Sequence, residues 1–287
     1  MTVYHTRFAP SPTGDMHLGN LRTAYFNWLA ARATGGTFTL RIDDTDRDRN
    51  TDGAVDTILD ILDWCGMDYD RMVRQSDRGD LYRMHLYDLH ALGRIDDSDG
   101  ADRIDVNPWV GDKFTDMVNG DCRVTDRGPL GKLVLARSDG SPTYHFASTV
   151  DDLDLGINLV IRGSDHLSNT PRHIGIAGAL GDDYPLTAHV GLIHRGKRKM
   201  SKRDDVGSVL ALRDSGVDPD ALLSYLLRLG WAPRDDSGKA AWVWPKDRAV
   251  AGFFTLGRMK AKASNFDDAQ FAWVARTWKS GAWKNYV

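Results

Sequence analysis

The stretch that decides the fold reads Arg7-Phe8-Ala9-Pro10-Ser11-Pro12-Thr13-Gly14-Asp15-Met16-His17-Leu18-Gly19-Asn20. We interpret it as the end of a short strand over residues 3–8 and a turn that carries His17 to the start of a helix. That helix has apolar residues about 3.6 positions apart and ends at Gly35-Gly36. A tight strand-to-helix turn directs unpaired backbone N–H groups at a ligand, which suits phosphate. Taken alone, the turn fits equally well a corner whose histidine has no function.

A second stretch far along the chain is strongly basic. It reads Gly196-Lys197-Arg198-Lys199-Met200-Ser201-Lys202-Arg203 and follows an apolar segment over residues 188–193. Such clusters are usually solvated surface. Together with a histidine at a helix start, however, a lysine loop suits ATP, because breaking the bond between the α- and β-phosphates needs cations on the departing pyrophosphate.

Composition limits the possible classes of protein. A chain of 287 residues with a net charge of −3 can form one large or two modest domains, and it has no bulk attraction for nucleic acid. Cys65 and Cys122 are too few for a disulfide framework or a zinc site, which indicates a reducing cytoplasm. No apolar run has membrane length. All 40 acidic residues are aspartate, although glutamate is common in ordinary proteins.

The two stretches resemble the two signatures of class I aminoacyl-tRNA synthetases. His17-Leu18-Gly19-Asn20 corresponds to the HIGH motif and Lys199-Met200-Ser201-Lys202-Arg203 to the KMSKS loop. Further segments resemble the glutamyl branch of this family, and the motifs stand in family order over residues 3–95 and 130–275. These segments are residues 7–14, Arg41-Ile42-Asp43-Asp44-Thr45-Asp46, Gly140-Ser141-Pro142-Thr143-Tyr144 and Val160-Ile161-Arg162-Gly163-Ser164-Asp165-His166.

The resemblance implies a Rossmann-like α/β fold with a parallel sheet. We expect residues 1–92 and 131–195 to form the two halves of the catalytic domain. Residues 93–130 would be a shortened form of the family's insert for the tRNA acceptor end, without zinc. Residues 196–287 would hold the lysine loop and a helical stem-contact region, with no anticodon-binding domain. A dehydrogenase-type Rossmann domain is excluded, because no Gly-x-Gly-x-x-Gly follows a strand.

The pattern of apolar residues predicts the other elements. Strands are expected over residues 37–42, 133–137, 143–150 and 157–161. Amphipathic helices are expected over residues 52–65, 78–92 and 218–230. No regular pattern is visible over residues 93–130.

The resemblance also assigns the nucleotide site. His17 and Lys202 would act on the phosphates of ATP, and Mg²⁺ would arrive with the nucleotide rather than in a protein metal site. The residues expected to contact ATP are Thr13, Gly14, His17, Gly19, Asn20, Lys199 and Lys202.

The substrate implied by the resemblance is L-glutamate. Two guanidiniums and one carboxylate suit its two negative groups and its ammonium, which favours glutamate over glutamine. The residues expected to contact it are Arg7, Ala9, Ser11, Asp43, Tyr144 and Arg162. A chain that handles glutamate but contains none is interpreted as a product of engineering or selection.

The acceptor of the activated glutamate remains open. A minimal glutamyl-tRNA synthetase is the leading interpretation, with a monomer that contacts the tRNA acceptor stem. The alternatives are a glutamyl-Q tRNA(Asp) synthetase, a ligase with a non-tRNA acceptor and a catalytically silent paralogue. Residues 245–287 carry eight basic and three acidic residues, a local charge of +5, interspersed with tryptophans. They are equally compatible with RNA contact and with packing.

Overall fold

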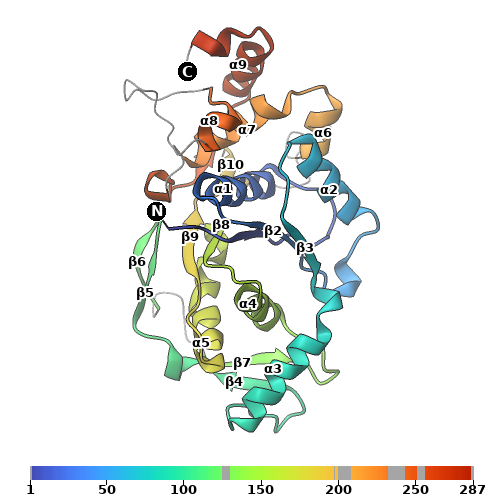
Figure 1. Cartoon of the computed structure of the whole chain (residues 1–287), viewed down its shortest axis with the longest axis vertical. Coiled ribbons are helices and arrows are strands. Elements are labelled where there is room, and N and C mark those ends of the chain that lie inside the picture. The colour runs from blue at the N-terminus through green and yellow to red at the C-terminus, as the bar shows by residue number, and fades with distance from the viewer. Residues whose placement is uncertain are drawn as a thin grey trace.

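A parallel sheet lies at the centre of the molecule (Figure 1). The structure is a computed structural model that describes residues 2–124, 130–196, 198–199, 208–231, 243–250 and 256–285. Strand β2 (Phe38–Ile42) pairs in parallel with β1 (Thr6–Phe8) and β3 (Arg71–Arg74). Strand β8 (Leu159–Gly163) pairs in parallel with β9 (Leu186–Val190).

The two groups of strands meet beside β1. The carbonyl of His5 accepts hydrogen bonds from the backbone N–H groups of Asn158 and Leu159, at 3.1 and 3.4 Å. The strands therefore run in the order β3–β2–β1–β8–β9. Since they are parallel, the carboxyl ends of β1, β2 and β8 lie at one edge of the sheet, where open α/β folds bind ligands. The prediction of a Rossmann-like α/β fold is confirmed.

Helices cover both faces of this sheet. Figure 1 shows α1 (Leu18–Thr34) on one side of the strands and α4 (Tyr144–Asp154) on the other. Helix α2 (Ala54–Trp64) lies near α1, while α3 (Gly79–Ala91) and α5 (Thr170–Leu180) pack with α4. The helices predicted over residues 52–65 and 78–92 are confirmed as α2 and α3.

Two strand predictions need correction. Residues 143–150 were expected to form a strand, but from Tyr144 onward they belong to helix α4. Phe146, Ala147 and Val150 are fully buried, and positions i, i+1 and i+4 share one face of a helix, not of a strand. Residues 133–137 do form a strand, β7 (Lys132–Ala136). It pairs antiparallel with β4 (Asp102–Asp105) in a separate two-stranded sheet rather than in the central one.

The region predicted as a shortened insert contains regular structure. Strands β5 (Lys113–Asp116) and β6 (Gly120–Arg123) form a hairpin. Asp116 of β5 lies opposite Thr187 of β9, in parallel pairing. The hairpin therefore extends the edge of the central sheet beyond β9 (Figure 1).

The C-terminal region packs on α1. Its main helix is α7 (Pro219–Gly230), which confirms the helix predicted over residues 218–230. Buried residues of α1, β9, α7 and α9 belong to one apolar core. None of the described helices is both long and apolar enough to cross a membrane. The other elements of this region are β10 (Ile193–Arg195), β11 (Arg198–Lys199), α6 (Val209–Asp214), α8 (Lys246–Arg248), β12 (Ser264–Asn265) and α9 (Asp268–Lys279).

Short 3-10 helices connect several of these elements. They are Arg47–Arg49, Gln75–Asp77, Asn107–Trp109, Ser164–Asn169, Leu256–Arg258 and Ala282–Asn285.

Candidate active site

Two adjoining cavities lie at the carboxyl ends of β1, β2 and β8. One has a volume of about 160 Å³ and the other about 390 Å³, and six residues line both of them. Eleven of the residues predicted for the site line these two cavities. The first cavity is lined by Arg7, Ala9, His17, Gly19, Asn20, Asp43, Tyr144 and Arg162, and the second adds Ser11, Thr13 and Gly14 to some of these.

His17 forms the N-terminal cap of α1. Its backbone is extended, and its Nδ1 accepts a hydrogen bond from the backbone N–H of Asn20 at 3.1 Å. Gly14, in the preceding turn, has a φ of 107°, which favours glycine. At Gly19 a Cβ atom would lie 3.0 Å from Nδ1 and Cε1 of the His17 ring. The sequence of the turn thus places an imidazole and the first backbone N–H groups of a helix side by side, an arrangement that suits phosphate.

The segment after the lysine loop reaches this corner. Ser208 forms an antiparallel bridge with His17, and the N–H of Val209 donates to the carbonyl of Met16 at 3.1 Å. Lys199 pairs with His194 through the backbone in β11. Lys202 lies outside the described residues, so its predicted contact with the nucleotide remains a prediction.

Four buried arginines line the first cavity, one each from β1, β2 and β8 and a fourth, Arg22, from α1. Arg7 donates from Nε to Asp152 Oδ1 at 3.0 Å. Arg41 donates to Asp43 through Nε and Nη2, at 2.6 and 3.2 Å, and to Asp152 through Nη1 at 2.7 Å. The guanidiniums of Arg7 and Arg41 are therefore neutralised by carboxylates of the protein itself, whereas among the described residues Arg22 donates to the carbonyl of Gly191 and forms no ion pair.

These ion pairs set the charge of the pocket. Burial opposes ionisation of Arg41, but Asp43 and Asp152 hold its pKa well above the usual value. Burial raises the pKa of Asp43 to about 6, against the lowering effect of Arg41. Burial also opposes ionisation of Asp152, yet Arg7 and Arg41 keep its pKa below the usual value. Arg41 and Asp152 therefore remain charged.

Arg162 has a different environment. Its Nε donates to Nε2 of His189 at 2.9 Å, and its Nη2 donates to Oγ1 of Thr170 at 3.0 Å. Nη1 lies 3.5 Å from Nδ1 of His173, whose pKa is held well below the usual value by burial and by the charge of Arg162. Within the described part of the chain, no carboxylate forms an ion pair with Arg162. Its positive charge is thus available to a ligand.

The sequence prediction missed several of these groups. Arg41 stood inside a motif but was not assigned to the site, and Asp152 was not singled out. His189 lies in a strand that is buried from Thr187 to Val190, and its side chain is fully buried. An ionisable residue inside a buried segment was the signal that could have indicated it, because such groups need partners.

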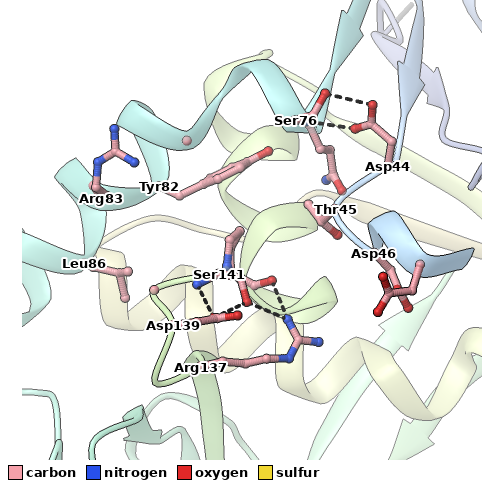
Figure 2. Close-up of a pocket in the computed structure, with 15 residues that line it drawn as sticks. Asp44, Thr45, Asp46, Ser76, Tyr82, Arg83, Leu86, Arg137, Asp139 and Ser141 are labelled. Atoms are coloured by element: carbon pink, nitrogen blue, oxygen red, sulfur yellow. Dashed lines mark hydrogen bonds between the residues drawn. The ribbon is translucent and has the colours of Figure 1, made fainter. Parts of the chain in front are cut away.

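A larger cavity of about 660 Å³ lies beside the site (Figure 2). Asp44 follows Asp43 in the chain, and its carboxylate accepts two hydrogen bonds from Ser76, from the backbone N–H and from Oγ, at 2.8 Å each. Across the cavity, Asp139 accepts from Ser141, as Figure 2 shows. Four aspartates and two arginines line this cavity, so it is less suited to phosphate than the His17 corner.

Comparison with known proteins shows which chains this one is similar to in sequence. The family model for the catalytic domain of class I tRNA synthetases (E and Q) matches residues 3–93 and 103–263. The chain is 40% identical to the glutamate–tRNA ligase 2 of Halorhodospira halophila, over 96% of this chain and 66% of the relative. It is 39% identical to the glutamate–tRNA ligase of Albidiferax ferrireducens, over 94% and 66%.

A solved structure is also similar to this chain. A glutamate tRNA ligase from Elizabethkingia meningosepticum, crystallised in complex with its amino acid, superposes with a TM-score of 0.83 at 27% identity. That superposition covers 96% of this chain and 69% of the other. The chain spans 66% of the length of the two curated relatives above.

Proposed function

The chain belongs to the class I tRNA synthetase family for glutamate and glutamine, and on this premise we propose that it activates L-glutamate with ATP and transfers it to tRNA. The proposal depends chiefly on Arg162, a buried guanidinium whose partners in the pocket are neutral. A buried charge without a counter-ion is costly, so the pocket favours a ligand that brings a carboxylate. Glutamine, with a neutral amide at that position, would leave the charge unpaired.

The other polar groups suit the rest of the amino acid. Arg7 and Arg41 share Asp152, and Asp43 is held by Arg41. We propose that Arg7 and Tyr144 contact the α-carboxylate, with Ala9 and Ser11 beside it, and that Asp43 faces the ammonium.

ATP is proposed to bind over the start of α1. Thr13, Gly14, Gly19 and Asn20 would surround the nucleotide, and His17, Lys199 and Lys202 would contact its phosphates. Within the described residues, no group of three histidine, cysteine or acidic side chains could hold a metal ion. Mg²⁺ is therefore proposed to bind through the phosphates of ATP, where it would neutralise charge that develops on the leaving group.

The reaction needs no general base. The α-carboxylate of glutamate is already ionised at neutral pH, so it can attack the α-phosphorus directly. The bond to pyrophosphate breaks and glutamyl-adenylate forms. What the protein contributes is position and charge: Arg7 and Arg162 orient the amino acid, and His17 and Lys202 stabilise the departing pyrophosphate.

The acceptor is proposed to be the 3′ end of a tRNA, bound by a monomer. A terminal ribose hydroxyl would attack the activated carbonyl and release AMP. The C-terminal region offers less for RNA stacking than its composition suggested. Trp244 is buried, and Trp278 stacks on Trp283 with ring centroids 4.8 Å apart. Trp273 is partly exposed on α9.

One assay tests the proposal. ATP–pyrophosphate exchange is measured with each amino acid, with and without total tRNA. We expect exchange with glutamate and none with glutamine, followed by incorporation of labelled glutamate into tRNA. Exchange with glutamine alone would contradict the proposed role of Arg162. Exchange without any incorporation into tRNA would exclude tRNA as the acceptor.

A further inference from the structure

One carboxylate of the predicted insert, residues 93–130, is connected by hydrogen bonds to the amino acid pocket. Asp116 ends strand β5 and is 1% exposed, and its Oδ2 lies 2.7 Å from Nδ1 of His189 on β9. His189 is fully buried, and its Nε2 lies 2.9 Å from Nε of Arg162. Three side chains from three adjacent strands thus form an unbroken series of hydrogen bonds from the insert to the pocket.

The chemistry of these groups fixes where the proton lies. A guanidinium N–H can only donate, so Nε2 of His189 must accept from Arg162. The imidazole proton therefore sits on Nδ1, where it is donated to Asp116. Burial, opposed by Asp116 but reinforced by Arg162, lowers the pKa of His189 to about 4, so the ring is neutral. Burial opposes ionisation of Asp116, yet hydrogen bonds from His189 and Asn119 hold its pKa well below the usual value.

This series determines how Arg162 is presented. Arg162 donates from Nε to His189 and from Nη2 to Thr170, and neither of these two partners carries a negative charge. The plane of the guanidinium is fixed while its charge is retained. We propose that Asp116 and His189 are positioning residues that orient Arg162 toward the side-chain carboxylate of glutamate. The inference rests on the proposed function, and it gives the insert a role in amino acid binding.

The hydrogen bonds around Asp116 require both of its side-chain oxygens to accept, so that replacing one oxygen by an NH₂ group should disrupt them. Oδ1 accepts hydrogen bonds from the backbone N–H groups of Val118 and Asn119 and from Nδ2 of Asn119. The backbone N–H of His189 donates to both oxygens, at 3.2 Å to Oδ1 and 3.1 Å to Oδ2. In an Asp116→Asn variant the amide oxygen must stay on the Oδ1 side, since an NH₂ group there would face four donors. The NH₂ group would then face Nδ1 and the backbone N–H of His189. The imidazole proton would move to Nε2, and two N–H groups would oppose each other between His189 and Arg162.

The experiment compares Asp116→Asn with two substitutions at His189. In His189→Gln, the new amide can donate to Asp116 and accept from Arg162, which preserves the series. In His189→Leu, Arg162 Nε has no acceptor. The matched control is Asp121→Asn, on the neighbouring strand β6, where the carboxylate is exposed and paired with Lys113. KM values for glutamate and for ATP are measured separately by pyrophosphate exchange.

We expect Asp116→Asn and His189→Leu to raise the KM for glutamate by about 10-fold to 100-fold, as for loss of a hydrogen bond to a charged group. The KM for ATP should stay the same in these two variants. In His189→Gln and Asp121→Asn, both KM values should equal those of the unmodified protein. The inference is overturned if the KM for glutamate is unchanged in both disruptive variants. It is also overturned if both KM values rise together with a lower unfolding temperature, which would indicate a structural role only.

A second measurement separates this inference from the proposed function. The ¹⁵N chemical shifts of His189 report its tautomer without any turnover. We expect a proton on Nδ1 in the unmodified protein and on Nε2 in Asp116→Asn. A proton on Nε2 in the unmodified protein would overturn the inference. An unmodified protein that shows the expected tautomer but no exchange with glutamate would instead refute the proposed function.

Discussion

Gly19 is the residue at which the His17 corner is tightest. A Cβ atom at this position would lie 3.0 Å from two atoms of the His17 ring. A Gly19→Ala substitution should therefore displace the imidazole from the phosphates. A misplacement of about 1 Å can cost about 10²-fold in rate, so we expect a loss of that order in kcat for pyrophosphate exchange. Alanine favours helices, but displacement of the ring also weakens its cap on the Asn20 N–H, so the two effects oppose each other and the unfolding temperature should change little.

Gly257 offers the control for this substitution. It has no heavy atom within 4 Å of its ideal Cβ position and no positive φ. Gly257→Ala should leave the exchange rate unchanged. A Gly19→Ala variant with a normal rate would show that the position of the His17 ring does not matter for the reaction.

The raised pKa of Asp43 predicts that the KM for glutamate depends on pH. Its pKa of about 6 lies above the usual value of 3.8, so it loses its charge as the pH falls through 6. If it faces the ammonium of glutamate, the KM for glutamate should rise by about tenfold between the neutral plateau and pH 5. The measurement is the KM for glutamate in exchange assays from pH 5 to 8. An Asp43→Asn variant should show a raised KM without this acid limb.

The same titration has the opposite effect on folding. A carboxyl group whose pKa is raised in the folded state stabilises that state when protonated, fully below pH 3.8, and this contribution is lost as the pH rises through 6. Protonation of Asp43 below pH 6 should therefore have two effects. Its contribution should raise the free energy of unfolding, and the loss of its charge should weaken glutamate binding. A parallel loss of both would indicate acid unfolding instead.

The positions of individual site residues could be predicted from motifs, but their partners could not. Arg7 and Asp43 line the cavity as the sequence indicated, yet each is paired with another side chain of the protein. The partner of Arg7 is Asp152, 145 residues away in the chain. No local pattern reveals a pair that only the packing of α4 against the sheet brings together.

Among the elements, helix α7 has the clearest start signal. Asp218 accepts hydrogen bonds from the N–H groups of Asp220 and Ala221, at 2.9 and 3.3 Å, and Pro219 follows it. Loss of such a cap costs about 1 kcal/mol. We expect Asp218→Ala to lower the free energy of unfolding in urea by about that amount. Asp214→Ala is the control, because this exposed carboxylate pairs, within the described part of the chain, with the adjacent Arg213. Equal effects of the two would argue against the cap.

Elements with a strong apolar period could be predicted, and α4 could not. Helices α2 and α7 bury a clear apolar face. Helix α4 also buries Ser148, Thr149, Asp151 and Asp152. The two aspartates and Ser148 are satisfied by Arg41, Arg78 and Gln75 from other elements, and Thr149 donates to the carbonyl of His145 in the same helix. The apolar residues of α4 do have helical spacing, but the neighbouring buried polar residues interrupt the continuous apolar stripe that identifies a helix in a sequence.

At the scale of the whole molecule, one core crosses the predicted domain boundary at residue 195. Phe26 of α1, Val190 of β9 and Leu226 of α7 belong to the same buried cluster. A Cβ atom at Gly230, the last residue of α7, would lie 2.6 Å from the Phe26 ring. We propose that residues 196–287 are an integral part of the catalytic unit, because α1, which carries the nucleotide corner, is buried against them.

Removal of that region tests this view. A chain cut after Arg195 would expose the face of α1 that α7 covers, including the fully buried Phe26, whose ring lies against Gly230. Fully burying one such side chain is worth about 1.5–3 kcal/mol, and total stabilities are about 5–15 kcal/mol, so losing several cannot be tolerated. We expect the fragment to unfold without a cooperative transition in urea, as followed by circular dichroism, and to show no glutamate-dependent exchange. A chain cut after Trp283 should keep its cooperative transition. Cooperative unfolding of the shorter fragment would instead establish residue 195 as a true domain boundary, and the position of α1 would then not depend on α7.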